Sequence, residues 1–171
     1  DAAVLNGDDP FLRQHMVNQF KELYWTSIGG KRAIDPIKPA TYVEDGWVKF
    51  ESLPIVKADA LKMSGDHNLQ NLLMAVTAAC LADLDPEAIA AGVTKFPGVP
   101  HRLEHICTWQ GVNFINDSKA TNYDAAEVGL RSVEAPVVLI AGGEAKAGDN
   151  AAWLQKIQAK ASMVLLIGAR A

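Results

Sequence analysis

The spacing of apolar residues predicts alternating strands and helices from the start of the chain. Residues 2–5 and 23–28 are β-rich runs, and between them Pro10 follows Asp9, a pair suited to the start of a carboxylate-capped helix. Between residues 41 and 58, two β-rich runs flank Glu44-Asp45-Gly46, whose Asp-Gly pair is typical of a tight hairpin turn. We therefore expect antiparallel strands at one edge of a sheet.

Two helices are expected next. Gly65-Asp66-His67-Asn68 opens the first, and its apolar stripe consists of Leu69, Leu72, Leu73, Val76, Ala79 and Cys80. The second runs from Pro86 to Lys95 behind Asp85 as its cap. Two prolines around a glycine in residues 96–100 then make a stiff connector. We therefore place a domain boundary there, with residues 1–98 in one domain and residues 99–171 in the next.

The pattern after the connector predicts a second α/β domain. We expect strands at 102–109 and 112–115 around a turn at Gln110-Gly111, then a helix at 123–133, a strand at 136–140, a helix at 151–161 and a strand at 163–168. A series that alternates strands and helices implies a parallel sheet with right-handed crossovers. The expected fold class is α/β, with two partial α/β domains. The final strand lacks a covering helix and the chain does not begin with Met, so we expect a piece of a longer enzyme.

Composition limits the partners, the cell compartment and the cysteine chemistry that we expect. The net charge is -4 and no Lys/Arg cluster interleaves with aromatic residues, which disfavours a nucleic-acid partner. No run approaches the ~18 apolar residues of a membrane span, and no leader pattern opens the chain, so we expect a cytoplasmic protein. Cys80 and Cys107 are far apart, one in a helical pattern and one in a strand pattern. We expect both to be buried thiols rather than parts of a disulfide or metal site.

Two polar loops follow neighbouring predicted strands. The first, after residue 115, contains Asp117, Ser118, Lys119 and Thr121, and the second begins at Gly142-Gly143 and contains Lys146. If both loops lie at one edge of the sheet, the two lysines converge and suit an anion that bears carboxylates or phosphates. The alternative is that both are ordinary solvated turns.

Polar residues also gather where the helix after Gly65 begins. Asn68 and Asn71 carry carboxamides that can bond to a base edge, and the helix dipole favours nearby phosphate. A simple structural role for His67 remains open. Arg102 follows the connector and can reach phosphate, or it can pair with Glu104 instead.

Two nucleotide-binding motifs are absent from the sequence. There is no G-x-x-x-x-G-K-[ST] loop, so this chain does not cradle a triphosphate by that route. The glycine pair after residue 141 lacks the third glycine of a dinucleotide fingerprint, which disfavours hydride chemistry.

Four motifs in order resemble the Mur ligase family. Their residues are 65–71 (GDHNLQN), 97–104 (PGVPHRLE), 116–122 (NDSKATN) and Gly142-Gly143 with Lys146. The run from Asp117 to Asn122 is the most specific, since other Mur ligases and the folylpolyglutamate synthetases carry a different loop there. The resemblance covers essentially the whole chain. It implies the late part of a P-loop-type ATPase central domain followed by the early part of a Rossmann-like C-terminal domain.

The resemblance also implies an activity. Such enzymes use ATP and Mg²⁺ to phosphorylate a substrate carboxylate, which an amino acid then attacks. The form of the 116–122 loop implies D-glutamate as the amino acid and UDP-N-acetylmuramoyl-L-alanine as the acceptor, in peptidoglycan synthesis. We expect a monomer at full length, with the Mg²⁺ ligands and the ATP-binding lysine outside this chain. Full activity is therefore not expected from these 171 residues alone.

The resemblance assigns roles residue by residue. The group expected to bind ATP comprises His67, Asn68, Asn71, Arg102 and Asp117, with Asp117 on the ribose and Arg102 on the phosphates. The group expected to face the acyl phosphate and D-glutamate comprises Lys119, Ser118, Thr121 and Lys146. Lys119 and Arg102 form the expected catalytic pair, because positive charge must stabilise phosphate transfer and the oxyanion.

Two other functions remain open from the sequence. One is an amide ligase of the same superfamily that uses a different amino acid. The other is a noncatalytic α/β module that binds a nucleotide or metabolite, which the missing triphosphate loop favours for the chain in isolation. The four ordered motifs favour the D-glutamate ligase.

Overall fold

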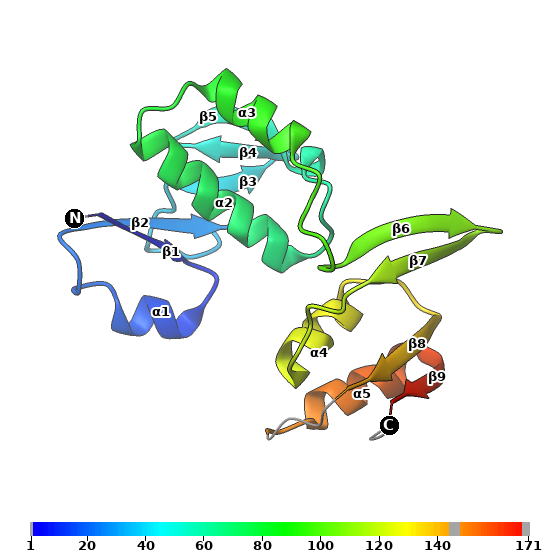
Figure 1. The fold of residues 1–171 in the computed structure, drawn as a ribbon. Helices are drawn as coiled ribbons and strands as arrows, with labels where there is room; N and C mark the ends of the chain where they lie inside the picture. Colours follow the sequence, from blue (N-terminus) through cyan, green and yellow to red (C-terminus); the bar gives the residue numbers. More distant parts are fainter. Residues whose placement is uncertain (1, 144–147, 169–171) are drawn as a thin grey trace. The chain divides into compact units, whose positions relative to one another are not determined.

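A computed structural model describes residues 2–143 and 148–168 of the chain (Figure 1). The chain forms two compact units. Unit 1 contains residues 1–62 and 66–97, and unit 2 contains residues 63–65 and 98–171.

Unit 1 is a mixed sheet with helices. Its elements are β1 (Ala2–Asn6), α1 (Pro10–His15), β2 (Glu22–Ser27), β3 (Thr41–Glu44), β4 (Trp47–Phe50), β5 (Leu53–Lys57), the 3-10 helix η1 (Ala58–Ala60), α2 (Asp66–Leu81) and α3 (Pro86–Lys95). The sheet order is β1-β2-β3-β4-β5, in which β1, β2 and β3 are parallel while β4 and β5 are antiparallel to their neighbours. The predicted antiparallel strands at a sheet edge are confirmed.

Tight turns join the antiparallel strands of unit 1. Asp45 and Gly46 have φ of 53° and 74°, the left-handed pair that a two-residue hairpin turn requires, so the predicted turn is confirmed. A second turn at Glu51 and Ser52, with φ of 47° and 84°, divides what the sequence suggested was one strand into β4 and β5. The prediction missed this turn because neither residue is of a type that favours positive φ.

The core of unit 1 lies between the sheet and the α2–α3 layer. Helix α2 packs against β1 to β4 and α3 packs against β5 (Figure 1). The apolar stripe predicted for α2 is confirmed, since Leu73 and Val76 are buried against Val48 of β4. The Thr41 and Thr77 hydroxyls bond to each other at 2.6 Å, and Thr77 also donates to the Leu73 carbonyl at 2.7 Å. Polar groups brought into this core are therefore paired.

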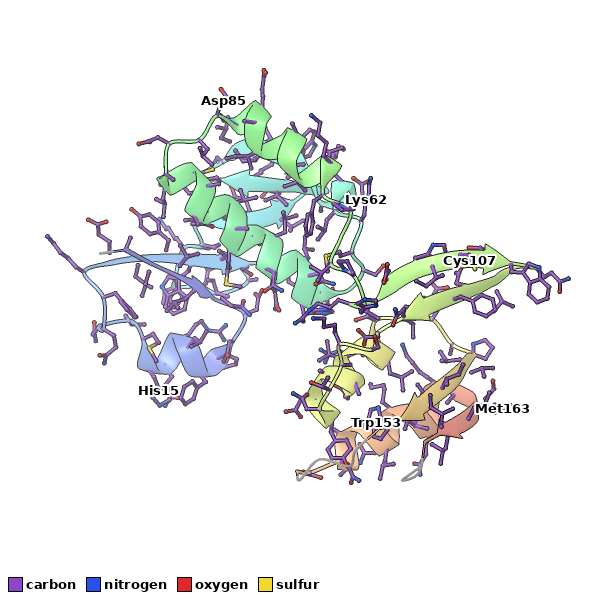
Figure 2. The ribbon with its side chains drawn as sticks, in the orientation of Figure 1. His15, Lys62, Asp85, Cys107, Trp153 and Met163 are labelled. Atoms are coloured by element: carbon purple, nitrogen blue, oxygen red, sulfur yellow. The ribbon has the colours of Figure 1, made fainter. Side chains whose placement is uncertain are left out.

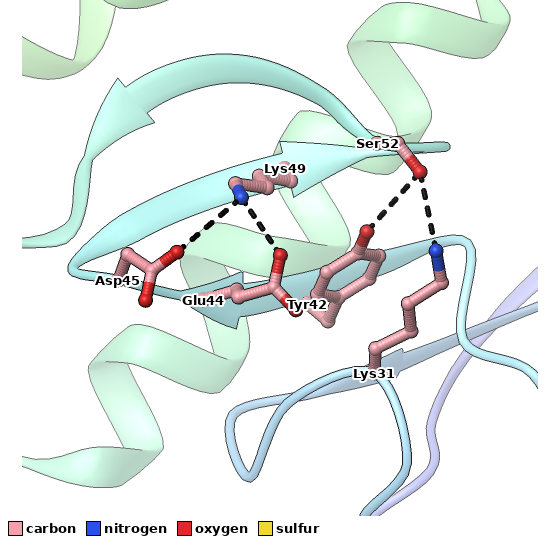
Figure 3. Close-up of polar contacts among 6 residues, drawn as sticks. All are labelled: Lys31, Tyr42, Glu44, Asp45, Lys49 and Ser52. Atoms are coloured by element: carbon pink, nitrogen blue, oxygen red, sulfur yellow. Dashed lines mark hydrogen bonds and ion pairs between the residues drawn. The ribbon is translucent and has the colours of Figure 1, made fainter.

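Side chains on and beside the β3–β4 hairpin form two small polar groups (Figure 3). The Lys49 ammonium lies 2.7 Å from the Glu44 carboxylate and 3.9 Å from that of Asp45. The hydrogen bond to Lys49 lowers the pKa of Glu44, and the same bond raises the pKa of Lys49. Separately, Ser52 Oγ accepts hydrogen bonds from Tyr42 and from the Lys31 ammonium.

The described part of unit 2 contains two short sheets and two helices. Its elements are β6 (Glu104–Trp109), β7 (Val112–Asn116), α4 (Tyr123–Arg131), β8 (Val137–Gly142), α5 (Ala151–Lys160) and β9 (Ala161–Ile167). Strands β6 and β7 are antiparallel, and β8 and β9 are parallel. The α/β class is confirmed. The prediction of one parallel sheet through β7, β8 and β9 is wrong for the described residues, because β7 pairs only with β6.

The two helices of unit 2 are joined by ring and polar contacts. The rings of Tyr123 and Trp153 lie 5.6 Å apart between centroids. At the other end, the Lys160 ammonium donates to the carbonyls of Arg131, at 2.8 Å, and Val133. The Arg131 carbonyl is one that the end of α4 leaves without a helical partner, and Val133 lies just beyond the helix, so Lys160 caps that end.

The cysteines differ from the expectation. Cys107 is exposed on β6 (Figure 2), where every residue after Glu104 is exposed. The prediction of a buried Cys107 thiol is wrong because, among the described residues, the β6–β7 hairpin has no layer packed over it. Cys80 in α2 is partly buried, and this burial raises its pKa.

Candidate active site

The loop after β7 leads directly into helix α4. Asn116 ends the strand, and its side-chain oxygen accepts the Ser118 backbone N–H at 3.1 Å. Asn122 caps α4 by accepting the Ala125 backbone N–H at 2.8 Å. Both ends of the loop are thus held by asparagine side chains, as their preference for turns and caps leads one to expect. The side chains between them that bear candidate chemistry, Ser118, Lys119 and Thr121, are exposed.

A second loop, residues 98–103, is hydrogen-bonded to the first. The Asp117 carboxylate accepts the Leu103 backbone N–H at 3.1 Å. The Lys119 backbone N–H donates to the His101 carbonyl at 3.0 Å. Since that carbonyl belongs to the peptide bond that precedes Arg102, the bond places Arg102 and Lys119 at neighbouring backbone positions. Unit 2 therefore brings together the two residues that the sequence predicts as a catalytic pair.

Arg102 is exposed and is not paired with Glu104, which was the alternative to a ligand role. The Glu104 carboxylate instead accepts the His101 backbone N–H at 2.8 Å and lies 3.6 Å from the His101 ring. Two like charges at neighbouring positions repel each other unless an anion lies between them. The arrangement is therefore suited to phosphate or carboxylate.

Asp117 has a structural role that the sequence did not reveal. One carboxylate oxygen bonds to the backbone of Leu103, and the other lies against Gly129 of α4. A Cβ added at Gly129 would lie 2.1 Å from that oxygen, so a larger residue there would have to displace the carboxylate. Asp117 thus joins both loops to α4. Its predicted contact with a ribose stays a prediction.

The other expected nucleotide contacts lie in unit 1. His67, Asn68 and Asn71 are all in the first turns of α2. Residues 68 and 71 are three apart and share a helix face. Asn68 is buried and Asn71 is exposed. The structure thus brings these three together on one helix, and their roles with ATP stay predictions.

The prediction that Lys119 and Lys146 lie close together no longer has the support of a shared sheet edge. It required β7 and β8 to end at one edge of a common sheet, but they belong to different sheets in the described part of the chain. Lys146 lies outside the described residues, so its role stays a prediction. Gly143 has φ of 125°, and a Cβ on Gly142 would lie 2.0 Å from the Ile167 carbonyl oxygen. The close approach at Gly142 is therefore to strand β9.

From the sequence, His101 and Asn116 were given no role. Glu104 was given only a possible ion pair with Arg102. The three residues contact one another in the fold. Asn116 and His101 are 15 positions apart in the sequence, and their side-chain nitrogens lie 2.8 Å apart. No local pattern indicates such a bond. The only available signal was that all three stand within the motifs on which the family resemblance rests.

Neither a metal site nor a membrane helix is found in the described residues. No three His, Cys, Asp or Glu side chains gather there to hold a metal ion. None of the described helices is long and apolar enough to cross a membrane.

Solved structures with a similar fold include ligases, although no protein-family model matches the chain. The pseudomurein peptide ligase type C from Methanothermus fervidus matches 96% of this chain and 45% of its own, with a TM-score of 0.64 and 16% identity. The MurF ligase from Thermotoga maritima in complex with ADP matches 96% and 43%, with a TM-score of 0.60 and 17% identity. At these identities the likeness concerns the fold.

Curated sequences also resemble the chain. Curated relatives match nearly the whole chain at identities that reach 62%, and they support the resemblance to the Mur ligase family along its length. Those relatives carry the name UDP-N-acetylmuramoylalanine–D-glutamate ligase. The Nostoc sp. protein is 62% identical over 98% of this chain and 37% of its own length, and that of Microcystis aeruginosa is 56% identical over 98% and 38%. The chain thus spans just over a third of the length of these relatives. The predicted resemblance is confirmed.

Proposed function

We propose that the protein carrying this chain is an ATP-dependent ligase that joins D-glutamate to UDP-N-acetylmuramoyl-L-alanine in peptidoglycan synthesis. The observation that carries the proposal is the 62% identity, over 98% of the chain, to a relative with that name. The placement of Arg102 beside Lys119 supports it, because the reaction needs positive charge on exposed loops. The ADP in one similar structure supports a nucleotide substrate.

The chemistry proceeds in two transfers. The γ-phosphoryl group of ATP passes to a carboxylate oxygen of the acceptor and ADP leaves. The amine nitrogen of D-glutamate then attacks the acyl carbon, and the tetrahedral intermediate releases phosphate and a proton. Arg102 and Lys119 stabilise the negative charge that develops on the phosphoryl oxygens and the oxyanion. Magnesium, if bound, would neutralise phosphate charge, and the described residues offer no group of three His, Cys, Asp or Glu side chains to hold it.

The two units carry different groups of the residues assigned to the substrates. Residues 1–98 form the late part of the ATP-binding domain, in which Asn68 and Asn71 contact the adenine side of ATP and His67 belongs to the same nucleotide-binding group. Residues 99–171 form the early part of the C-terminal domain, in which Asp117 contacts the ribose. The side chains that hold the D-glutamate carboxylates are Ser118, Thr121 and Lys146. The full-length protein acts as a cytoplasmic monomer.

The test is an assay of ADP and phosphate release by the full-length protein that carries this chain. With UDP-N-acetylmuramoyl-L-alanine and ATP present, turnover is expected to require D-glutamate and to be absent with L-lysine or meso-diaminopimelate. Indifference to D-glutamate would refute the proposed substrate. Binding of ATP without turnover on any amino acid would favour a noncatalytic nucleotide-binding module instead.

A further inference from the structure

His101 is held through three of its polar groups. Its ring Nδ1 lies 2.8 Å from the side-chain nitrogen of Asn116. Its backbone N–H donates to the Glu104 carboxylate at 2.8 Å, and its carbonyl accepts the Lys119 backbone N–H at 3.0 Å. These contacts come from β6, the end of β7 and the loop after it. We call His101, Glu104 and Asn116 the histidine clamp.

The orientation of Asn116 defines the donor in this clamp. Its side-chain oxygen accepts the Ser118 backbone N–H at 3.1 Å, which only an oxygen can do. The –NH₂ group must therefore face His101, where it donates to Nδ1. A ring nitrogen that accepts carries no proton, so the imidazole proton lies on Nε2.

The clamp acts on a backbone that would not hold its conformation unaided. His101 and Leu103 have φ of 67° and 46°, a region that is unfavourable for residues with a Cβ. Both flank Arg102, so the direction of the Arg102 side chain depends on these two conformations. Leu103 is held by Asp117, and His101 is held by the other two clamp residues, Glu104 and Asn116. Without the clamp, a more relaxed loop would move Arg102 away from Lys119.

We propose that Asn116 and Glu104 are positioning residues that act through His101 to hold Arg102 beside Lys119. Neither has to touch ATP or the amino acid. The inference rests on the proposed function, because it assigns the pair to the same phosphate and carboxylate chemistry. Its effect would be on the rate of the chemical step, since a displacement of about 1 Å at a charged group can lower a rate on the order of 100-fold.

The decisive variant is Asn116→Ala in the full-length enzyme, with Asn113→Ala as the matched control. Asn113 lies on the same strand, and its side chain accepts a hydrogen bond from Thr108 near the other end of the hairpin. We expect Asn116→Ala to lower kcat by about 10- to 100-fold, whereas Asn113→Ala leaves kcat within about twofold. The KM for the UDP-linked acceptor is expected to change little in both, because neither residue binds it.

A conservative variant separates positioning from loss of fold. Asn116→Asp keeps the acceptor for Ser118, and its carboxylate accepts a hydrogen bond from the Nδ1–H group once the imidazole changes tautomer. We therefore expect Asn116→Asp to recover most of the kcat that Asn116→Ala loses. Glu104→Ala removes the other contact, and in combination with Asn116→Ala it is expected to lower kcat by less than the product of the single effects.

Distinct outcomes contradict the two proposals. If the wild-type protein does not turn over with D-glutamate, the proposed function fails. If the wild-type protein turns over but Asn116→Ala and Asn113→Ala have equal kcat, the positioning role fails. If Asn116→Ala melts at a lower temperature and Asn116→Asp restores the melting temperature without restoring kcat, Asn116 is only structural and the inference is overturned.

Discussion

The two units differ in what holds them together. Unit 1 contains ten of the eleven buried hydrophobic residues described, whereas Leu130 is the only one from unit 2. The strands of unit 2 carry large exposed apolar side chains, such as Ile140 at 63% and Leu166 at 60% exposure. Unit 1 is therefore stabilised by burial of apolar side chains. The candidate site loops of unit 2 are instead held by polar bonds to backbone groups.

The largest expected effect is on stability and tests this contrast directly. Leu73 of α2 is fully buried, so Leu73→Ala should lower the free energy of unfolding by about 3–5 kcal/mol. The matched change Leu165→Ala removes a side chain that is 44% exposed and should cost less than about 1 kcal/mol. Urea unfolding of both variants, with hydrogen exchange of the α2 and β9 amides, measures the difference. Equal losses would mean that β9 is as well buried as α2.

The next effect is on activity and separates the units by function. Lys119→Met should lower the rate of ADP release by about 100- to 1000-fold, as loss of a charge that stabilises a transition state does. Lys95→Met, at the exposed end of α3 in unit 1, is the matched control and should leave the rate within about twofold. Equal rates for the two variants would remove Lys119 from the catalytic pair.

Two helical glycines should give effects of opposite sign. A Cβ at Gly129 of α4 would lie 2.1 Å from the Asp117 carboxylate, so Gly129→Ala should destabilise unit 2 by about 1–3 kcal/mol. Gly92 of α3 has open space at the same point, and Gly92→Ala should stabilise unit 1 by up to about 1 kcal/mol. Thermal unfolding of both variants checks the signs. A stabilising Gly129→Ala would show that Asp117 does not pack against α4.

The contrast also explains which parts of the fold the sequence predicts. The helices and most strands follow from local periodicity, and the residue types of Asp45-Gly46 predict the turn there. The residue types at Glu51-Ser52 do not predict a turn, since the positive φ values there are imposed by the pairing of β4 with β5. Which strand pairs with β7 is likewise a nonlocal question. The pattern of alternating strands and helices suggested a common parallel sheet and was wrong in that respect.

The candidate site shows the same division. Arg102 and Lys119 stand out as charged residues in loops, and the structure brings their backbones together. Asn116 and Glu104 do not stand out, because their importance depends on contacts with His101 that only the folded chain creates. Sequence therefore predicts the groups that bear chemistry better than the groups that hold them in place.

The smallest expected effect concerns the hairpin of unit 1, whose charged pair is exposed. The Lys49 ammonium lowers the pKa of Glu44, so the pair adds stability above the ordinary pKa of a glutamate and loses it as the pH falls through the lower folded value. Conversely, Glu44 raises the pKa of Lys49, so the contribution is also lost as the pH rises through that raised value. Glu44→Gln should therefore cost a little stability at neutral pH and nothing in strong acid, and added salt should weaken the effect. Glu22→Gln, at the exposed start of β2, is the control, and urea midpoints at neutral and acid pH measure both. A Glu44→Gln cost that persists in acid would mean that the hairpin depends on packing of this side chain rather than on its charge.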